Sequence, residues 1–568
     1  MEMTPLSPLS YGLAFAACAL LLLSDRYGRT DGKDIPQKAH TAICALTVLL
    51  GCMARLVRLT SLPGGLSAEE ALVAVQAKAL WQTGHFVDAR GFAAQLPQWT
   101  GEPAGPLLCV FTAPFAGIFG ITGLTTRLPL ALFSCLAMPA AYLTGTELSG
   151  RKAGRWFLLF WALSPFFVLT ARLTAAASLS LCILPWALAL AFRGLRKPGY
   201  LLPASVLMGL LTFTENLYFY LAPWLIILLA VAALRSGRRA GQVLPAAAAG
   251  LVICLPGILT AIACREAGAD IDVGPLLFPH LEEYDKARNL FTMLKGKPHP
   301  DSVVFDKLWA VLTGGFFQNV MHSNISYTLF VTGGMTALGL FSVPLALAGA
   351  LILLTQRIKG ERFTPAVRLA VLFGCATLLA ELFFGSVGEM EVNGTTSIWD
   401  HAQWFPYTAL LAVAALCRVQ EKNRWCARGF LAVFAVGFTA ICLDLFGGGY
   451  AQNANVYFTD YREAVESGET IHAQSGAKLY VTSSVYPHLS PDEAARMMLY
   501  CMEDADLREV AVNPDKYGEI YWPEGEEEPE KGCIHVVLQR EIRNWIWEDA
   551  DFEYLPVGRF AVLKPRTN

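Results

Sequence analysis

The sequence predicts a polytopic α-helical membrane protein that carries a small α/β domain at its C-terminal end. Of the 568 residues, 54% are hydrophobic and only 16% are charged, and the mean hydropathy is +0.43. This composition is too apolar for a water-soluble protein. Long apolar runs recur over residues 1–450, whereas residues 451–568 are soluble in composition. The net charge of −3 gives no support for nucleic-acid binding, so such a partner is not expected.

The apolar runs predict twelve spans, several shorter than the roughly 20 residues that a straight transmembrane helix needs. A further apolar run over 103–120 is predicted to lie along the outer membrane face, because counting it as a span would reverse the side of the loops that follow. The twelve spans are expected near residues 9–24, 40–59, 126–147, 156–171, 177–193, 200–214, 217–234, 243–263, 336–355, 366–386, 403–418 and 429–447.

Basic residues predict the orientation of these spans. Lys and Arg gather in six short loops that all fall on one side, and the positive-inside rule assigns this side to the cytoplasm. We therefore expect both termini, the loops 61–125 and 265–335 and the domain 451–568 to lie outside the cytoplasm of a multi-pass plasma-membrane protein. The six clusters begin at Arg26, Arg151, Arg193, Arg235, Arg357 and Lys422.

The C-terminal stretch predicts an α/β domain of about a hundred residues, which is large enough to hold its own core. Ser490 and the residues after it are typical of a helix start, with a Ser cap and a proline in the first turn. Cys501 and Cys533 both fall in this domain, where a disulfide is one option that the sequence leaves open. The strand-like runs cover residues 478–482, 509–512, 534–538 and 560–564.

Two adjacent carboxylates, Glu69 and Glu70, follow the second predicted span and open a helix. Charge near hydrocarbon is costly, so acids at the mouth of a transmembrane bundle are a functional-site hypothesis. Ser67 and Glu70 also match a capping box, in which Glu70 would return a hydrogen bond to the cap. Local pattern alone leaves both interpretations open.

Several short motifs follow one another between residues 55 and 193. They are Ala68-Glu69-Glu70-Ala71, Thr83-Gly84-His85-Phe86, Glu102-Pro103-Ala104-Gly105-Pro106-Leu107, Phe119-Gly120, Thr126-Arg127-Leu128-Pro129, Ser164-Pro165 and Ala171-Arg172. Their order resembles the GT-C class of membrane glycosyltransferases that use polyprenyl-phosphate sugars, which includes protein O-mannosyltransferases and lipid A aminoarabinose transferases. The pattern of that family is an acidic pair, a Gly turn, a Pro-rich amphipathic segment and an Arg-Leu-Pro opening of the next span.

The resemblance implies a GT-C fold and transfer of a monosaccharide from a polyprenyl-phosphate donor to an envelope lipid, polymer or protein, in contact with membrane lipids. Glu69 stands where the family has Asp, and residues 173–178 contain no acid where the family usually has one. Glu69 is expected to be the general base that takes the acceptor proton. Glu70 would hold the acceptor, a metal or the helix cap.

Cations are expected to stabilise the departing lipid phosphate. Arg55, Arg58 and Arg172 lie near the outer ends of spans. Arg172 ranks first because the resemblance places it in the site, whereas Arg55 and Arg58 also fit snorkelling to head groups. His401, beside Gln403, is a further candidate for the phosphate, although Trp399 and Trp404 also predict an interfacial anchor there.

Three further interpretations concern the bundle. Glu215 and Tyr218 lie at a break between two short spans, where irregular backbone usually lines a polar cavity, so both are candidate cavity residues. Arg127 is expected to fix the joint between the surface helix and the next span. No metal-ligand spacing appears, and whether a divalent metal takes part stays open.

Two other functions remain alternatives to the transferase. The altered acid pair and the missing acid of the second loop fit a non-catalytic relative that binds lipid-linked sugar or scaffolds envelope assembly. A transporter fits the number of spans and the break at Glu215, but a corresponding Gly/Pro-interrupted span in a second half is lacking.

Overall fold

The computed structural model divides the chain into two compact units, which are described separately. The first comprises Met1–Leu59, Trp99–Leu107 and Leu130–Gln452, and the second comprises Thr60–Gln98, Leu108–Pro129 and Asn453–Asn568. The residues that the structure describes are 36–60, 62, 68–84, 86, 105–215, 217–262, 271–273, 276–278, 342–384, 403–422, parts of 428–446, 461–481, 520–521, 530–542 and 551–566.

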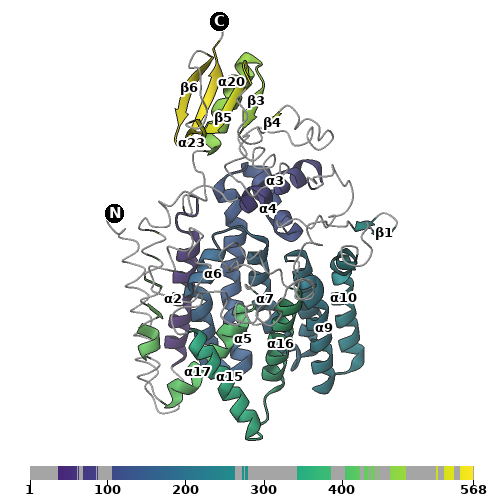
Figure 1. The fold of residues 1–568 in the computed structure, drawn as a ribbon. Coiled ribbons are helices and arrows are strands. Elements are labelled where there is room, and N and C mark those ends of the chain that lie inside the picture. Colours follow the sequence, from purple (N-terminus) through teal and green to yellow (C-terminus); the bar gives the residue numbers. More distant parts are fainter. Residues whose placement is uncertain are drawn as a thin grey trace, which may run out of the picture. The chain divides into compact units, whose positions relative to one another are not determined.

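The first unit is a bundle of apolar helices (Figure 1). A buried apolar cluster joins α7, α8, α9, α10 and α16 through Leu188, Met208, Leu225, Cys254 and Phe373. The described helices of this unit are α2 (Gln37–Leu56), most of α5 (Gly123–Leu163), α6 (Pro165–Thr170), α7 (Ala176–Gly194), η1 (Pro198–Tyr200), α8 (Leu201–Leu210), η2 (Leu211–Phe213), α9 (Leu217–Arg235), α10 (Ala240–Ile262), α15 (Ser342–Ile358), α16 (Pro365–Phe384) and α17 (Phe405–Lys422). A short hairpin of β1 (Ile271–Val273) and β2 (Leu276–Phe278) follows α10.

Helix α5 consists of two arms that fold back on each other. Ser149 and Gly150 have non-helical backbone angles and interrupt the helix. A Cβ atom built on Gly145 would lie 2.6 Å from the carbonyl oxygen of Ala153, so the two arms pack with backbone against backbone. Such close approach of small residues is typical of helix pairs in membranes. The arms correspond to the helices predicted over 126–147 and 156–171, with the basic cluster of Arg151 at their turn.

Most predicted spans correspond to apolar helices, but their number stays a prediction. In the described part of the chain, four helices are long and apolar enough to cross a membrane, namely Gln37–Leu56, Gly123–Leu163, Leu217–Arg235 and Ala240–Thr260. Shorter apolar helices lie over 178–194, 198–213, 348–358 and 405–420. The predicted span 9–24 lies outside the described residues, and 429–447 is described only in part.

The second unit contains the segment that follows α2. Helices α3 (Ala68–Thr83) and α4 (Pro106–Phe119) belong to it, as does the first turn of α5. A Cβ atom built on Gly117 of α4 would lie 2.1 Å from Cγ of Trp81 in α3, so the indole packs directly on the backbone of this glycine. The helix predicted within the apolar run 103–120 is therefore present as α4.

The C-terminal part of the second unit is a mixed five-stranded sheet in the order β4-β3-β5-β7-β6. Strand β3 pairs in parallel with β4 and β5, whereas β7 pairs antiparallel with β5 and β6. Helix α20 packs on the sheet through Gly468, where a Cβ atom would lie 2.9 Å from side-chain atoms of Leu479 and Val536. The elements are α20 (Tyr461–Ser475), β3 (Leu479–Val481), β4 (Ile520–Tyr521), β5 (Ile534–Leu538), α23 (Gln539–Ile542), β6 (Phe552–Val557) and β7 (Phe560–Pro565).

Three of the four predicted strand runs correspond to β3, β5 and β7, and the α/β class holds for this sheet. Strands β4 and β6 were not predicted. The predicted strand over 509–512 and the helix start at Ser490 lie outside the described residues, as does Cys501. Its suggested partner Cys533 is a buried free thiol.

Candidate active site

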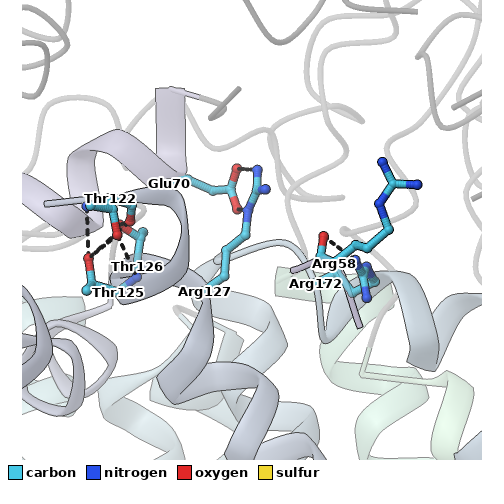
Figure 2. Close-up of polar contacts among 7 residues, drawn as sticks. All are labelled: Arg58, Glu70, Thr122, Thr125, Thr126, Arg127 and Arg172. Atoms are coloured by element: carbon cyan, nitrogen blue, oxygen red, sulfur yellow. Dashed lines mark hydrogen bonds and ion pairs between the residues drawn. The ribbon is translucent and has the colours of Figure 1, made fainter. Parts of the chain in front are cut away.

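Glu70 forms a buried, two-pronged ion pair with Arg127. Nε of Arg127 donates to Oε1 of Glu70 at 2.7 Å, and Nη2 donates to Oε2 at 2.8 Å (Figure 2). The side chains are 1% and 0% exposed. Both carboxylate oxygens therefore bind one guanidinium, in the bidentate geometry that holds this pair most rigidly. The contact joins the first turn of α3 to the first turn of α5.

The start of α5 is capped in a way that fixes Arg127. Thr122 is the N-cap residue, and its backbone N–H donates to Oγ1 of Thr125 at 2.8 Å while the N–H of Thr125 donates to Oγ1 of Thr122 at 3.1 Å. Thr126 adds a hydroxyl bond to the carbonyl of Thr122 at 2.8 Å (Figure 2). This reciprocal arrangement satisfies N–H groups that a helix start leaves open. Arg127 follows directly on a rigid turn.

The predicted base Glu69 precedes Glu70 in α3, and its side chain lies outside the described residues. Ser67, the proposed cap, lies outside them as well. What the structure adds is the anchor next to Glu69: the Glu70–Arg127 ion pair holds the turn of α3 that carries it. The expectation that Arg127 fixes the joint between the surface helix and the next span stays a prediction, because this contact joins α5 to α3, and the sequence did not indicate Glu70 as a partner of Arg127.

Arg55 is fully buried and uses all five of its N–H donors. Interpreting this residue as snorkelling to head groups is wrong, because its side chain is 0% exposed and bonds only to protein. Pro165 cannot donate to the carbonyl of Trp161, and Arg55 supplies that missing donor. The acceptors are Oγ of Ser134 at 2.9 Å and the carbonyl oxygens of Gly51 at 3.0 Å, Ala162 at 2.8 Å, Trp161 at 2.7 Å and Phe167 at 2.9 Å.

Arg172 makes the reciprocal contact with the end of α2. It lies just after α6, is 1% exposed, and its guanidinium carbon sits 5.5 Å from the ring centre of Phe446. Its nitrogens donate to main-chain carbonyls of α2 and of the turn after it, and Figure 2 shows the bond to the carbonyl of Arg58. The acceptors are the carbonyl oxygens of Ala54 at 2.9 Å, Arg55 at 3.0 Å, Val57 at 3.0 Å and Arg58 at 3.2 Å.

Arg58 differs from these two arginines because its side chain is exposed. It points away from Arg172 (Figure 2), and in the described part of the chain no hydrogen bond or ion pair joins it to another residue. Arg58 and Arg172 are in contact because Nη2 of Arg172 donates to the carbonyl oxygen of Arg58. The third predicted phosphate ligand, His401, lies outside the described residues.

The predicted cavity residues lie at a real break in the bundle. The 3-10 turn η2 ends at Phe213 and α9 begins at Leu217, so Glu215 sits between them. Tyr218 is fully buried, and its hydroxyl donates to Oε1 of Gln403 at 2.6 Å. Nε2 of Gln403 donates to Oγ of Ser180 at 2.8 Å. This chain of bonds connects α9, α7 and the residues that lead into α17.

Glu381 is a buried acid that the sequence analysis missed. It lies in α16, is 1% exposed, and is close enough to Tyr218 and Tyr407 to interact with them electrostatically. The signal was available, since Glu381 is the single carboxylate of the predicted span 366–386. An ionisable residue inside a membrane span is a functional candidate by default. Together with Glu215 it gives this part of the bundle two acids.

The part of the chain that the structure describes contains no cluster of metal-binding side chains. No group of three or more His, Cys, Asp or Glu side chains there could hold a metal ion. Glu70, the candidate ligand of the acid pair, already binds Arg127 with both oxygens.

Comparison with solved structures shows the fold. The chain resembles ArnT from Cupriavidus metallidurans in the apo state, a GT-C glycosyltransferase, with a TM-score of 0.52 and 14% identity over 92% of this chain and 98% of that chain. The structure of ArnT bound to undecaprenyl phosphate has a TM-score of 0.50 and 15% identity, over 92% of this chain and 98% of that chain. The archaeal oligosaccharyltransferase AglB from Archaeoglobus fulgidus has a TM-score of 0.47 and 14% identity, over 81% of this chain and 63% of that chain. No protein-family model and no curated protein sequence matches the chain. The expected GT-C fold is therefore confirmed.

Proposed function

We propose that this protein is an integral-membrane glycosyltransferase that moves a monosaccharide from a polyprenyl-phosphate donor to an acceptor of the cell envelope, outside the cytoplasm. The observation that carries the proposal is the GT-C fold shared with ArnT, one structure of which holds undecaprenyl phosphate. The ordered motifs that include Glu69, Glu70, Arg127 and Arg172 support it, and two of these residues form the rigid joint described above.

In the proposed reaction the acceptor hydroxyl attacks the anomeric carbon of the sugar. Its proton passes to the carboxylate of Glu69, the new C–O bond forms, and the bond between the anomeric carbon and the phosphate oxygen breaks with inversion. The polyprenyl phosphate leaves with the bonding electron pair and an added negative charge. A cation beside the phosphate stabilises this charge as it develops.

Glu70 is proposed to act through position rather than by contact with substrate. Both of its oxygens bind Arg127 in a buried pair, and this contact supports a role in holding α3. A base must lie within about 3 Å of the proton that it takes, and a shift of the helix by one ångström disturbs that geometry. The ion pair supplies the rigidity that Glu69 needs.

The experiment that tests the function is single-turnover transfer from radiolabelled polyprenyl-phosphate sugars to extracted envelope acceptors, with the full chain in detergent or nanodiscs. We expect transfer by the wild type and a loss of at least a hundredfold in Glu69→Gln, because general base catalysis contributes about 10²–10⁴-fold. Glu361→Gln, which neutralises an exposed acid after α15, is the matched control and should transfer at the wild-type rate.

The same assay separates the proposal from the non-catalytic alternative. Donor binding by wild type and Glu69→Gln, with transfer by neither in an acceptor pool that an active relative can glycosylate, would establish a binding protein instead. Residues 173–178 contain no acid where the family usually has one, and this observation favours the non-catalytic alternative.

A further inference from the structure

The end of α2 is held by a single side chain. A helix leaves its last four carbonyl oxygens without intrahelical donors. Arg172 supplies donors to the carbonyls of Ala54 and Arg55 and then to those of Val57 and Arg58, which lie beyond the last helical residue. One buried guanidinium therefore fixes the path of the chain through residue 58.

This path includes an uncommon backbone conformation at Arg58. Its φ angle is +52°, in the left-handed region that favours glycine, and Arg58 alone among the described non-glycine residues has a positive φ. A long side chain adopts this region only where the surroundings impose it. The bonds from Nη2 of Arg172 to the carbonyls of Val57 and Arg58 are that constraint.

The conformation directs the Arg58 side chain outward. Arg58 is exposed and points away from Arg172 (Figure 2), and no other described side chain binds its guanidinium, which can therefore donate to a ligand. Both terminal nitrogens of Arg172, in contrast, donate to carbonyl oxygens. Of the two arginines that the sequence associates with phosphate, Arg58 is the one whose guanidinium has no partner among the described residues.

Buried charge nearby favours an anion at this end of α2. Arg55 lies in the last turn of the helix, and no carboxylate among the described residues forms an ion pair with it. A cation that is balanced by carbonyl and hydroxyl dipoles rather than by a carboxylate leaves a positive field that raises the local concentration of anions. A guanidinium exposed in that field suits a phosphate monoester, which it binds with two parallel hydrogen bonds.

We propose that Arg58 binds the phosphate of the lipid-linked donor and that Arg172 is a positioning residue, which acts by holding Arg58 in its left-handed conformation. This inference rests on the proposed function, because it takes the donor to be a polyprenyl phosphate. It corrects the ranking that the sequence suggested, in which Arg172 came first.

The first test measures binding of radiolabelled undecaprenyl phosphate to the full chain in phosphatidylcholine nanodiscs. We expect at least tenfold weaker binding in Arg58→Gln and Arg58→Gly, partial retention in Arg58→Lys, and wild-type binding in the control Arg357→Gln, which removes an exposed guanidinium at the end of α15. Glycine adopts a positive φ without strain, so Arg58→Gly should unfold at the wild-type temperature or above it. Loss of binding is then separated from loss of fold.

The second test asks how Arg172 acts. Arg172→Lys cannot hold four carbonyls, and we expect it to weaken binding in the wild-type background but to add nothing in the Arg58→Gln background. If Arg172 contacts the phosphate itself, its effect persists in that background and the proposal is overturned. Wild-type binding by Arg58→Gln would also overturn the proposal that Arg58 binds the phosphate, and it would leave the proposed transferase function unaffected.

Competition distinguishes the possible sources of the phosphate group. Excess phosphatidylglycerol or inorganic phosphate should displace undecaprenyl phosphate poorly from the wild type. Equal displacement by phosphatidylglycerol means that Arg58 binds bulk head groups, and this outcome overturns the proposal. A wild type that binds no undecaprenyl phosphate at all overturns the polyprenyl-phosphate donor itself, so the two failures are distinguishable.

Discussion

At the scale of the residue, the ion pair of Glu70 and Arg127 links stability to activity. Removing one partner of a buried pair leaves the other charge without compensation and costs about 3–5 kcal/mol, whereas replacing both by apolar residues is often neutral. We expect Glu70→Gln to unfold at a clearly lower temperature than the wild type. The double variant Glu70→Leu/Arg127→Met should recover most of that loss. Thermal unfolding of the full chain in detergent measures both.

An exposed pair provides the control for this experiment. Nζ of Lys564 lies 3.8 Å from Oε2 of Glu553, and both side chains are about half exposed. Such surface pairs contribute about 0–1 kcal/mol, so Glu553→Gln should leave the unfolding temperature almost unchanged. A Glu70→Gln variant as stable as the wild type would contradict the structural role. A stable double variant without transfer would show that activity needs the ion pair itself and not only the stability of the fold.

What the sequence could predict about single residues follows from the cost of charge. Glu70 was recognised because charge near a membrane span is costly, whereas Arg127 and Arg172 were recognised from the motifs of the family resemblance. Their partners were not, since the carbonyls that Arg172 binds lie 114 to 118 positions away and nothing local encodes the contact. Arg55 shows the same limit, as its position at a span end predicted a surface role while the fold buries it completely.

At the scale of the element, the two arms of α5 depend on Gly145. A Cβ atom there would lie 2.6 Å from the carbonyl oxygen of Ala153, and a backbone atom in the opposite arm cannot move aside as a side chain can. Overpacking of this kind costs about 1–3 kcal/mol. We expect Gly145→Ala to lower the unfolding temperature of the full chain in a fluorescence or calorimetric scan.

A second glycine makes the comparison specific. Gly241 opens α10 and has nothing within 4 Å of a built Cβ atom. Since alanine is the better helix former, Gly241→Ala should leave the unfolding temperature unchanged or raise it slightly. Equal destabilisation by both variants would argue against close packing of the two arms of α5.

Elements with a strong local signal were predicted well. The turn between the arms of α5 coincides with the Arg151 cluster, and the break at Glu215 separates η2 from α9 as the hydropathy pattern indicated. Strands β4 and β6 escaped detection for opposite reasons. Strand β4 has only two residues, while β6 carries Glu553 and Pro556 on an edge of the sheet, where strand propensity is weak.

At the scale of the whole molecule, acid should weaken the C-terminal sheet. His535 is buried in β5 between Tyr480 and Phe552, and burial lowers the pKa of its imidazole. Its Nε2 lies 3.0 Å from the carbonyl oxygen of Glu530, so this nitrogen carries the proton of the neutral ring. The folded sheet thus binds fewer protons at His535 than the unfolded chain does.

The sign of the pH effect follows from this difference. Above about pH 6.5, the pKa of the imidazole in the unfolded chain, His535 is neutral in both states. Below that pH the unfolded chain binds a proton at His535 that the folded sheet does not bind as readily, so the stability of the sheet decreases as the pH decreases. The hydroxyl of Tyr480 donates to the carboxylate of Glu530 and lowers the pKa of that group, which adds a loss in the same direction at more acidic pH.

Hydrogen exchange of the full chain checks this prediction. Protection factors of the β3 and β5 amides should fall as the pH drops from about 7 to 5, and the slope should be smaller in His535→Phe. His472→Gln, which changes a histidine of α20, should keep the wild-type slope. Protection that is constant over this range would be inconsistent with a neutral buried His535.

The five donors of Arg55 also have a consequence for how the protein is made. Helix α2 leaves the ribosome with an arginine in its last turn, but the acceptors of that arginine lie up to 112 residues further along the chain. Until Phe167 has been synthesised, the nascent span carries a cation that hydrocarbon does not tolerate cheaply. Membrane integration of α2 therefore depends on α5 and α6, which supply four of the five acceptors of its arginine.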